Sequence, residues 1–246
     1  MNAKEKKKEQ KPRSEDSDAG TADLIRELGL AASGTDFESD LQYISIIGSI
    51  EGHIALPMEN KTTKYEHLIP QLIAVEENPK LRGLLVILNT MGGDVEAGLA
   101  LAEMIATLSK PTVSLVLGGG HSIGIPLATA TDYSFIAGTA TMTLHPIRTT
   151  GLVITAETTF DYMRKTQDRV IDFIAGHSRA TRKRVTELMN CSDNMSNDVG
   201  TILFGKEAVD AGIIDAVGGV SQALGELRRR VAKVDELEKE ISISTD

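Results

Sequence analysis

The chain has 246 residues, of which 41% are hydrophobic and 25% charged, and its formal net charge at pH 7 is −9. This composition is typical of a globular protein and differs from that of a fibrous or largely disordered chain. The length suffices to bury the core of one α/β domain. The acidic balance argues against nucleic acid as a partner, because phosphate binding needs a basic surface.

The sequence predicts a cytoplasmic protein that is not integral to a membrane. No apolar run approaches the roughly 20 residues needed to span a bilayer, and no apolar segment follows the first lysines, as it would in a secretory signal. Cys191 is the single cysteine, so an intrachain disulfide is excluded and a reducing compartment fits. Because no base adjoins Cys191 in the sequence, we interpret it as a passive thiol.

Three parts of different composition divide the chain. Residues 1–40 form an arm of low complexity, with interspersed acidic and basic residues, that we expect to be disordered. Residues 41–220 carry the hydrophobic pattern of a folded domain. Residues 221–246 are expected to form a charged amphipathic helix or tail, which either lies on the domain or frays.

Within the domain, strand-like and helix-like patterns alternate. Strands are predicted at 43–50, 83–89, 112–117, 133–136 and 141–144, and helices at 65–75, 95–108, from about 122, over 156–189 and around 204–212 before one more strand. In the long helical stretch, five side chains are expected to face the core: Phe160, Met163, Val170, Ile171 and Ile174. The alternation indicates an α/β fold of parallel βαβ units with right-handed crossovers.

Two glycine-bearing segments follow predicted parallel strands, which is where an α/β sheet collects its ligands. Residues 89–94 read Asn-Thr-Met-Gly-Gly-Asp and residues 118–122 read Gly-Gly-Gly-His-Ser, and each segment directly precedes a predicted helix. Turns of this kind leave backbone N–H groups unpaired at the start of the helix. If the two strands are neighbours, N–H groups from both turns converge and stabilise a tetrahedral oxyanion.

Ser122 is the candidate nucleophile. A sharp turn from strand to helix lifts one hydroxyl out of the backbone, as an acyl-transfer enzyme requires. On local sequence alone, the more common interpretation of residues 118–122 is a glycine-packed turn closed by a capping serine. For Gly92 and Gly93 it is a tight turn that needs positive φ. The pairing of the two turns favours the functional interpretation.

A serine nucleophile needs a base, and His145 is the candidate among five histidines. It follows the predicted strand at 141–144 and precedes Pro146, at the end of the sheet where the site is expected. His121 adjoins Ser122 and is a candidate for lining the pocket only. The other three are interpreted as surface or structural residues: His53, His67 and His177.

Several segments together resemble the ClpP-type serine peptidases. The family's Asn-Ser-Pro-Gly-Gly…Ala-Gly-Leu-Ala segment is similar to Asn89-Thr90-Met91-Gly92-Gly93 with Gly98-Leu99-Ala100. The family's Ser-Met-Gly around the nucleophile is similar to Ser122-Ile123-Gly124, and its Ile-His-Gln-Pro is similar to Leu144-His145-Pro146. Its Glu-Glu-Ala…Gly-Leu-Ile-Asp is similar to Glu207-Ala208 through Gly212-Ile213-Ile214-Asp215. The segments keep the family's order between Ile44 and Val217. Each motif is weak by itself, but their combination is specific.

The resemblance implies a crotonase-like or ClpP-like fold of stacked βαβ units with a long helix after the core, so that residues 41–220 form the catalytic domain. The implied activity is that of a cofactor-free serine endopeptidase, without a metal, that cleaves peptides or unfolded segments. Ser122 would be the nucleophile and His145 the base. The oxyanion hole would come from three backbone N–H groups, those of Gly92, Gly93 and Ile123.

The resemblance also implies a triad acid shortly before residue 207. An ungapped alignment puts Ser196 opposite the family aspartate. A deletion of two residues would put Asp198 there, which is our choice, and Asp193 is the other candidate. Without an acid, His145 would be held less firmly in its catalytic tautomer.

The resemblance also implies a homo-oligomer, and we expect a protein that supports preprotein export, with a link to the secretion machinery. The family's two stacked heptameric rings do not carry over, because residues 147–154 differ from the Gly- and Gln-rich connection that mates those rings. Met91, in place of the family proline, is a further departure. Residues 1–40 lack the short apolar loop with which the family engages ATPases, so no ATPase partner is inferred.

Two other function classes stay open on the sequence. A coenzyme A-linked hydratase or isomerase of the crotonase class would use a similar oxyanion hole on a thioester. That class needs acidic residues in place of Ser122 and His145 and a basic patch for the nucleotide, which the sequence does not indicate. The second class is a scaffold that has kept the fold and lost its triad, an alternative favoured by Ser196 in the ungapped alignment.

Overall fold

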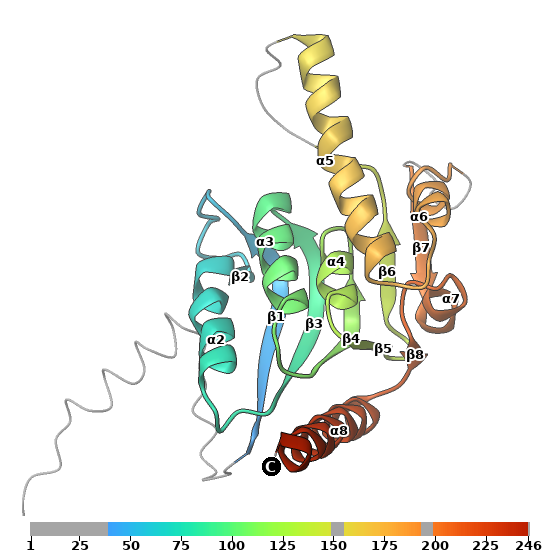
Figure 1. Cartoon of the computed structure of the whole chain (residues 1–246). Coiled ribbons are helices and arrows are strands. Elements are labelled where there is room, and N and C mark those ends of the chain that lie inside the picture. Colours follow the sequence, from blue (N-terminus) through green and yellow to red (C-terminus); the bar gives the residue numbers. More distant parts are fainter. Residues whose placement is uncertain (1–38, 149–154, 193–198, 246) are drawn as a thin grey trace, which may run out of the picture. The chain divides into compact units, whose positions relative to one another are not determined.

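The computed structural model describes residues 39–148, 155–192 and 199–245. Its strands are β1 (Leu41–Glu51), β2 (Thr62–Lys64), β3 (Gly83–Gly93), β4 (Thr112–Gly120), β5 (Tyr133–Ile136), β6 (Thr141–Leu144), β7 (Thr201–Phe204) and β8 (Ala216–Val217). Its helices are α2 (Tyr65–Glu77), α3 (Val95–Ala106), α4 (Gly124–Thr129), α5 (Ala156–Gly176), α6 (Arg182–Met189), α7 (Gly205–Asp210) and α8 (Val220–Thr245). Strands and helices alternate along most of this chain (Figure 1).

The main sheet is parallel, with the strand order β2-β1-β3-β4-β5-β8. Strands β3 and β4, which carry the two glycine-bearing segments, are direct neighbours in it. Strand β6 leaves the path of this sheet: it meets β4 at the pair Gly119–Thr141 and then runs antiparallel to β7. The predicted α/β fold of parallel βαβ units is confirmed. His145 directly follows the last residue of β6.

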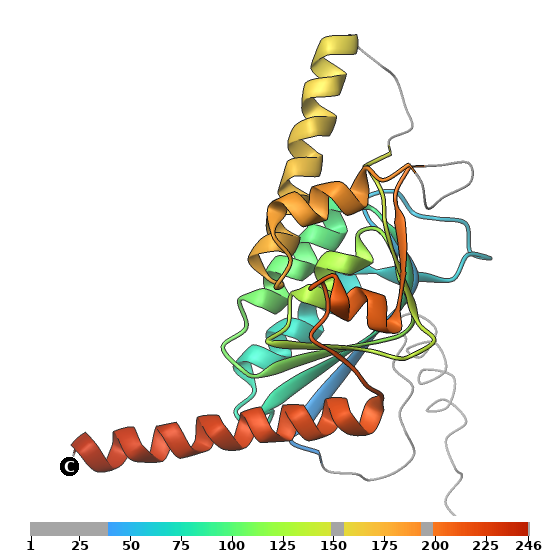
Figure 2. The ribbon, with the colours of Figure 1, turned by 90° about the vertical axis from the view of Figure 1, so that its right-hand side faces the viewer.

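Helices cover both faces of the main sheet, and alternate side chains of each strand enter different cores. Val86 and Leu88 of β3 belong to a core shared with α2, α3 and α4. Leu85 of β3 and Leu115 of β4 face the other way, into a smaller core with Leu227 of α8. In Figure 2, α8 runs along the lower end of the sheet, away from α3 and α4. Burial on both faces explains why the central strands read as continuous apolar runs.

The stretch 156–189, predicted as continuously helical, is two helices. Helix α5 ends at Gly176, and α6 starts after Thr181, whose hydroxyl accepts a hydrogen bond from the Arg184 N–H at 3.2 Å. This capping bond marks the start of a separate helix, α6. Two short strands, β2 and β7, were not predicted from the sequence.

Of the five side chains expected to face inward from the long helix, three are buried and Met163 is half-buried. The buried ones are Val170, Ile171 and Ile174. The prediction for Phe160 is wrong, because its side chain is 67% exposed. The reason is visible in Figure 1, where the N-terminal part of α5 extends beyond the sheet and its covering helices.

The two glycine-bearing segments, predicted as turns, continue their strands. β3 runs on to Gly93 and β4 to Gly120, with a shift of register between them: Leu88 pairs with Val116, and Thr90 pairs with Gly120. The extra residues of β4 form a bulge, a feature that glycine accommodates because it has no Cβ. Among the described residues, no helix is long and apolar enough to cross a lipid bilayer.

Candidate active site

Ser122 lies immediately after β4 in a backbone conformation that serine rarely adopts. Its φ is +56°, and it is the one residue other than glycine with positive φ among the described parts of the chain. The turn is closed by two hydrogen bonds, from the Gly124 N–H to the His121 carbonyl at 2.9 Å and from the Ile125 N–H to the Ser122 carbonyl at 3.0 Å. A left-handed serine between a strand and a helix is the geometry of a nucleophile elbow.

Gly92 of β3 brings the neighbouring strand against this turn. Its φ is +91°, and a Cβ added to it would lie 2.8 Å from the Ser122 Cβ and 2.9 Å from the His121 carbonyl oxygen. A side chain at position 92 would therefore be strained by its own backbone and would also displace the serine. The two glycine-bearing segments, which were predicted to converge, are in contact.

His145 follows the last residue of β6, as predicted, and its ring is half-buried. Its Nδ1 lies 2.7 Å from the carbonyl oxygen of Pro146. Since a carbonyl only accepts hydrogen bonds, Nδ1 must carry the hydrogen. In the neutral ring this leaves Nε2 unprotonated, which is the state that a general base needs.

Ser122 and His145 line one cavity of about 160 Å³. Most of its other lining residues are aliphatic. The lining comes from β3, β6, the segment that follows β6, and the helices α3, α4, α5 and α6. The complete lining is Gly93, Val95, Ser122, Ile123, Ile125, Leu144, His145, Ile147, Arg148, Val170, Ile174 and Met189. The cavity thus brings together the predicted nucleophile and the predicted base, and its lining is mostly apolar.

The three predicted oxyanion donors differ in their surroundings. The Gly92 N–H donates a hydrogen bond to the Thr90 hydroxyl at 3.1 Å, and that hydroxyl donates to the Gly48 carbonyl at 2.6 Å. Gly93 and Ile123 both line the cavity. Within the described residues, no side chain and no loop carbonyl accepts a hydrogen bond from the Ile123 N–H. Ile123 is therefore better placed than Gly92 to donate to a bound carbonyl, and Gly93, which pairs with Ile50 of β1, also lies at the cavity.

His121 does not line this cavity, contrary to the expectation from its neighbour Ser122. Its Nδ1 lies 2.8 Å from the hydroxyl oxygen of Thr143, and its Nε2 lies over Gly119. Burial, and secondly the charge of nearby His145, lower the pKa of His121 below its ordinary value. The ring is thus held in its neutral form at neutral pH, as a packing partner of β6.

The remaining candidates are distributed as follows. Asp198 and Asp193, and Ser196 opposite the family aspartate, lie outside the described residues. His177 caps the C-terminal end of α5, where its Nδ1 lies 2.9 Å from the Phe173 carbonyl oxygen. No group of three or more histidine, cysteine, aspartate or glutamate side chains in the described ranges is placed to hold a metal ion.

Three further residues of this neighbourhood were not singled out from the sequence. Thr143 accepts the Ser122 N–H at its carbonyl oxygen, and Thr90 binds the Gly92 N–H. A Cβ on Gly200 would lie 3.0 Å from the Cβ of His145. For Thr143 the available signal was spacing, since it precedes His145 by two residues in the sequence.

The comparison with protein families agrees with this arrangement. A family model described as Clp protease matches residues 39–221, which cover the whole sheet and the cavity. The chain belongs to the Clp protease family. The resemblance to ClpP-type serine peptidases noted in the sequence, and the fold it implied, are thereby confirmed.

The chain also resembles another protein along most of its length. It is 53% identical over 222 residues to the translocation-enhancing protein TepA of Halalkalibacterium halodurans. The matched region covers 90% of this chain and 87% of the relative. The similarity therefore extends over nearly the full length of both proteins.

Proposed function

We propose that this protein is a cytoplasmic serine endopeptidase that cleaves peptides or unfolded segments through an acyl-enzyme. Ser122 is the nucleophile, His145 the general base and Asp198 the orienting acid. The observation that carries the proposal is the left-handed Ser122 at the end of β4, which shares a mostly aliphatic cavity with His145. Family membership supports the same chemistry.

The geometry supports the following sequence of steps. The Nε2 atom of His145 takes the proton of the Ser122 hydroxyl while Oγ attacks the substrate carbonyl. The N–H groups of Ile123 and Gly93, with Gly92 as a further candidate, stabilise the oxyanion that forms, and one such donor is typically worth about 3 kcal/mol. The imidazolium then protonates the departing amine, and water attacks the acyl-enzyme with His145 again acting as base.

The assignment of the acid to residues 193–198 is supported by the residues that flank them. The Gly200 N–H donates a hydrogen bond to the Cys191 carbonyl at 2.7 Å, so the two ends of the segment lie together. Gly200 also packs against the Cβ of His145. Gly200, which follows Asp198 by two residues in the sequence, therefore lies beside the proposed base. Asp198 is the proposed acid and Asp193 its competitor.

The biological setting is proposed from the relative. Because the similar protein is named for enhancing translocation, we propose that this peptidase supports preprotein export and is linked to the secretion machinery. It would act as a homo-oligomer, without a cofactor. Nucleic acid is not among the proposed partners, in keeping with the net charge of −9.

The test is covalent labelling with a fluorophosphonate, which reacts with activated serines. The wild-type protein should take up one probe per chain, and the Ser122→Ala variant none. Ser109→Ala, which removes an exposed hydroxyl outside the cavity lining, is the matched control and should label normally. Labelling of another serine, or no labelling of folded protein, would favour the scaffold that has lost its triad.

The roles of base and acid are tested with the same probe. His145→Ala should lower the rate of acylation by several orders of magnitude, as in other triads. Asp198→Ala should lower it strongly and Asp193→Ala only weakly. Equal and mild effects of the two aspartate variants would show that neither carboxylate holds the imidazole. The alternative of a coenzyme A thioester enzyme is not supported, since no carboxylate is among the described residues that line the cavity.

A further inference from the structure

Strand β7 has one edge that the rest of the described chain leaves open. Among the described strands, it pairs with β6 alone, and Ile202 of β7 lies opposite Thr143 of β6. The Thr143 carbonyl accepts the Ser122 N–H and therefore points away from β7. The two residues of an antiparallel pair direct their main-chain groups either toward each other or both away. The N–H and C=O of Ile202 therefore point away from β6.

A second hydrogen bond gives the same orientation. The Phe204 N–H donates to the Glu207 carboxylate at 3.0 Å and so does not bond to β6. Because main-chain groups two residues apart on a strand point the same way, the Ile202 N–H shares this direction. Within the described residues, no side chain and no loop group forms a hydrogen bond with the main chain of Ile202. Such open main-chain groups at a sheet edge are a template for a further strand.

A groove of about 720 Å³ follows this edge. All four residues of Thr201–Phe204 line it, although their side chains are alternately buried and exposed. A hollow over one face of a strand would be lined by every second residue, so this groove runs along the edge. Helices α6 and α7, with the residues that directly follow them, supply the other described lining. Ile202 and Phe204 are 37% and 56% exposed and offer apolar surface on one side of the strand.

The charges of the groove favour a cationic occupant. Three of its described lining residues are carboxylates. Asp210 binds Lys206 at 2.6 Å, and Glu187 lies 3.8 Å from Arg184. No described lysine, arginine or histidine forms an ion pair with the third, Glu207. A second copy of this chain fits less well, because pairing β7 with β7 across a two-fold axis would bring the acidic groups of both copies together.

We propose that the edge of β7 binds an extended peptide segment that carries branched apolar side chains at alternate positions and one lysine or arginine. The segment adds a strand: it forms two main-chain hydrogen bonds with Ile202, packs on Ile202 and Phe204, and places its cation at Glu207. In this mode the main chain contributes affinity and alternate side chains contribute specificity. The groove shares no described lining residue with the cavity at Ser122, so the inference is independent of the proposed peptidase function.

A fluorescein-labelled peptide tests the proposal. It contains one Val-Thr-Val sequence among glycine and serine residues, with a lysine at one end. Its binding to the full-length Ser122→Ala protein, which cannot cleave it through Ser122, is measured by fluorescence anisotropy. N-methylation of the one amide that donates to Ile202 should weaken binding about fivefold or more, as for one lost hydrogen bond. Methylation of the two neighbouring amides should change it little. Equal losses at consecutive positions would overturn the addition of a strand.

Variants of β7 connect binding to this edge. Ile202→Pro removes the outward N–H and keeps the hydrogen bonds to β6, because an edge strand tolerates proline on its open side. Binding should fall at least about fivefold. Ile202→Val keeps the N–H and is the matched control, which should bind within about twofold of the parent protein. Circular dichroism verifies that both variants are folded.

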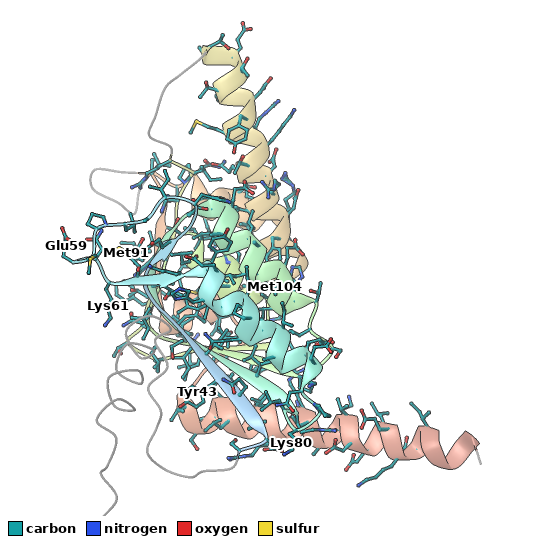
Figure 3. All side chains as sticks on the ribbon, turned by 90° about the vertical axis from the view of Figure 1, so that its left-hand side faces the viewer. Tyr43, Glu59, Lys61, Lys80, Met91 and Met104 are labelled. Carbon is teal, nitrogen blue, oxygen red and sulfur yellow. The ribbon has the colours of Figure 1, made fainter. Side chains whose placement is uncertain are left out.

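The position of the cation is tested at Glu207. The lysine peptide should bind about twofold to fivefold more tightly than its glutamine counterpart, the range for an exposed ion pair. Glu207→Gln keeps an acceptor for the Phe204 N–H and should abolish this advantage. Glu59→Gln removes an exposed carboxylate on the segment between β1 and β2, which Figure 3 labels, and should leave the advantage intact. An advantage of lysine that survives in Glu207→Gln overturns the assignment of the cation.

Three outcomes remain to be distinguished. Binding that is unchanged in Ile202→Pro would place the peptide elsewhere and overturn the proposal. Absence of binding would overturn it too, and a lower mass of Ile202→Pro in solution would then assign the edge to a second copy. Fluorophosphonate labelling of Ser122 in the wild-type protein reports on the peptidase alone, so a failure of either proposal is visible without the other.

Discussion

The backbone N–H of Ser122 donates a hydrogen bond to the carbonyl of Thr143 at 2.8 Å. This bond joins the turn after β4 to β6, and Thr143 of β6 lies two residues before His145, which directly follows that strand. Together with the pair Gly119–Thr141 and the contact of His121 with the Thr143 hydroxyl, this backbone contact positions the nucleophile relative to the base. Because the hydrogen bond is between main-chain atoms, it survives side-chain substitutions at either residue.

The left-handed conformation of Ser122 predicts an unusual order of stability among its variants. Its φ of +56° disfavours every residue with a Cβ, by about 1–2 kcal/mol. Ser122→Gly should therefore be more stable than Ser122→Ala by about 1 kcal/mol, although both lose the nucleophile. Chemical denaturation followed by circular dichroism measures the difference. An alanine variant at least as stable as the glycine variant would contradict the strained turn.

Gly92→Ala should damage both stability and acylation. The added Cβ would lie 2.8 Å from the Cβ of Ser122, on a backbone with φ of +91°. We expect a loss of at least about 1 kcal/mol in the free energy of unfolding, and a fall of roughly 100-fold in the acylation rate, because the serine and its donors shift together.

Gly225→Ala is the matched control for the Gly92 variant. Gly225 lies within α8, and a Cβ there meets no atom within 4 Å. The substitution should raise stability by up to about 1 kcal/mol, since alanine favours a helix, and leave labelling unchanged. Similar damage from both alanines would show that the contact of Gly92 with Ser122 is unimportant.

Helix α8 should contribute to stability through its first half. Leu227 is fully buried in the core that α8 shares with β3 and β4, whereas Leu237, further along the same helix, is 48% exposed. Leu227→Ala should lower the free energy of unfolding by about 2–5 kcal/mol, and Leu237→Ala by less than about 1 kcal/mol. Thermal and chemical unfolding of the two variants provide the comparison. Equal losses would mean that the helix is not docked as described.

Much of this arrangement could be predicted from the sequence, for identifiable reasons. The central strands are buried on both faces, so they appear as apolar runs such as 83–89 and 112–117. In a parallel sheet, strand ends collect at one edge, which brought the segment at Ser122 together with that at Gly92. Ser122 and His145 were identified as candidates because each follows such a strand.

What could not be predicted depends on contacts between distant segments. The bulge in β4 and the pairing of β6 with β7 have no periodic signal, because each follows from how strands meet in space. The exposure of Phe160 arises because α5 extends past its neighbours, although the helix itself has a regular amphipathic pattern. The bond of His145 to the Pro146 carbonyl occupies Nδ1, the atom at which the proposed acid would also act, and it depends on a ring orientation that no motif encodes.

The pH dependence of stability should report on His121. Burial, and secondly the charge of His145, lower the pKa of His121 in the folded protein below its ordinary value of 6.5. Between the lowered pKa and 6.5, the unfolded chain binds more protons than the folded protein, so stability falls as the pH drops through this window. Above pH 6.5 both states hold the ring neutral, and the effect is absent.

Replacing the imidazole with a group that does not titrate should remove this acid sensitivity. His121→Gln keeps a polar partner for the Thr143 hydroxyl, so we expect a smaller loss of the denaturation midpoint between pH 7.5 and pH 5.5 than in the wild-type protein. His67→Gln on α2 removes an imidazole elsewhere and serves as the control. If His121→Gln loses as much stability on acidification as the wild type, the buried neutral ring is not what makes the fold sensitive to acid.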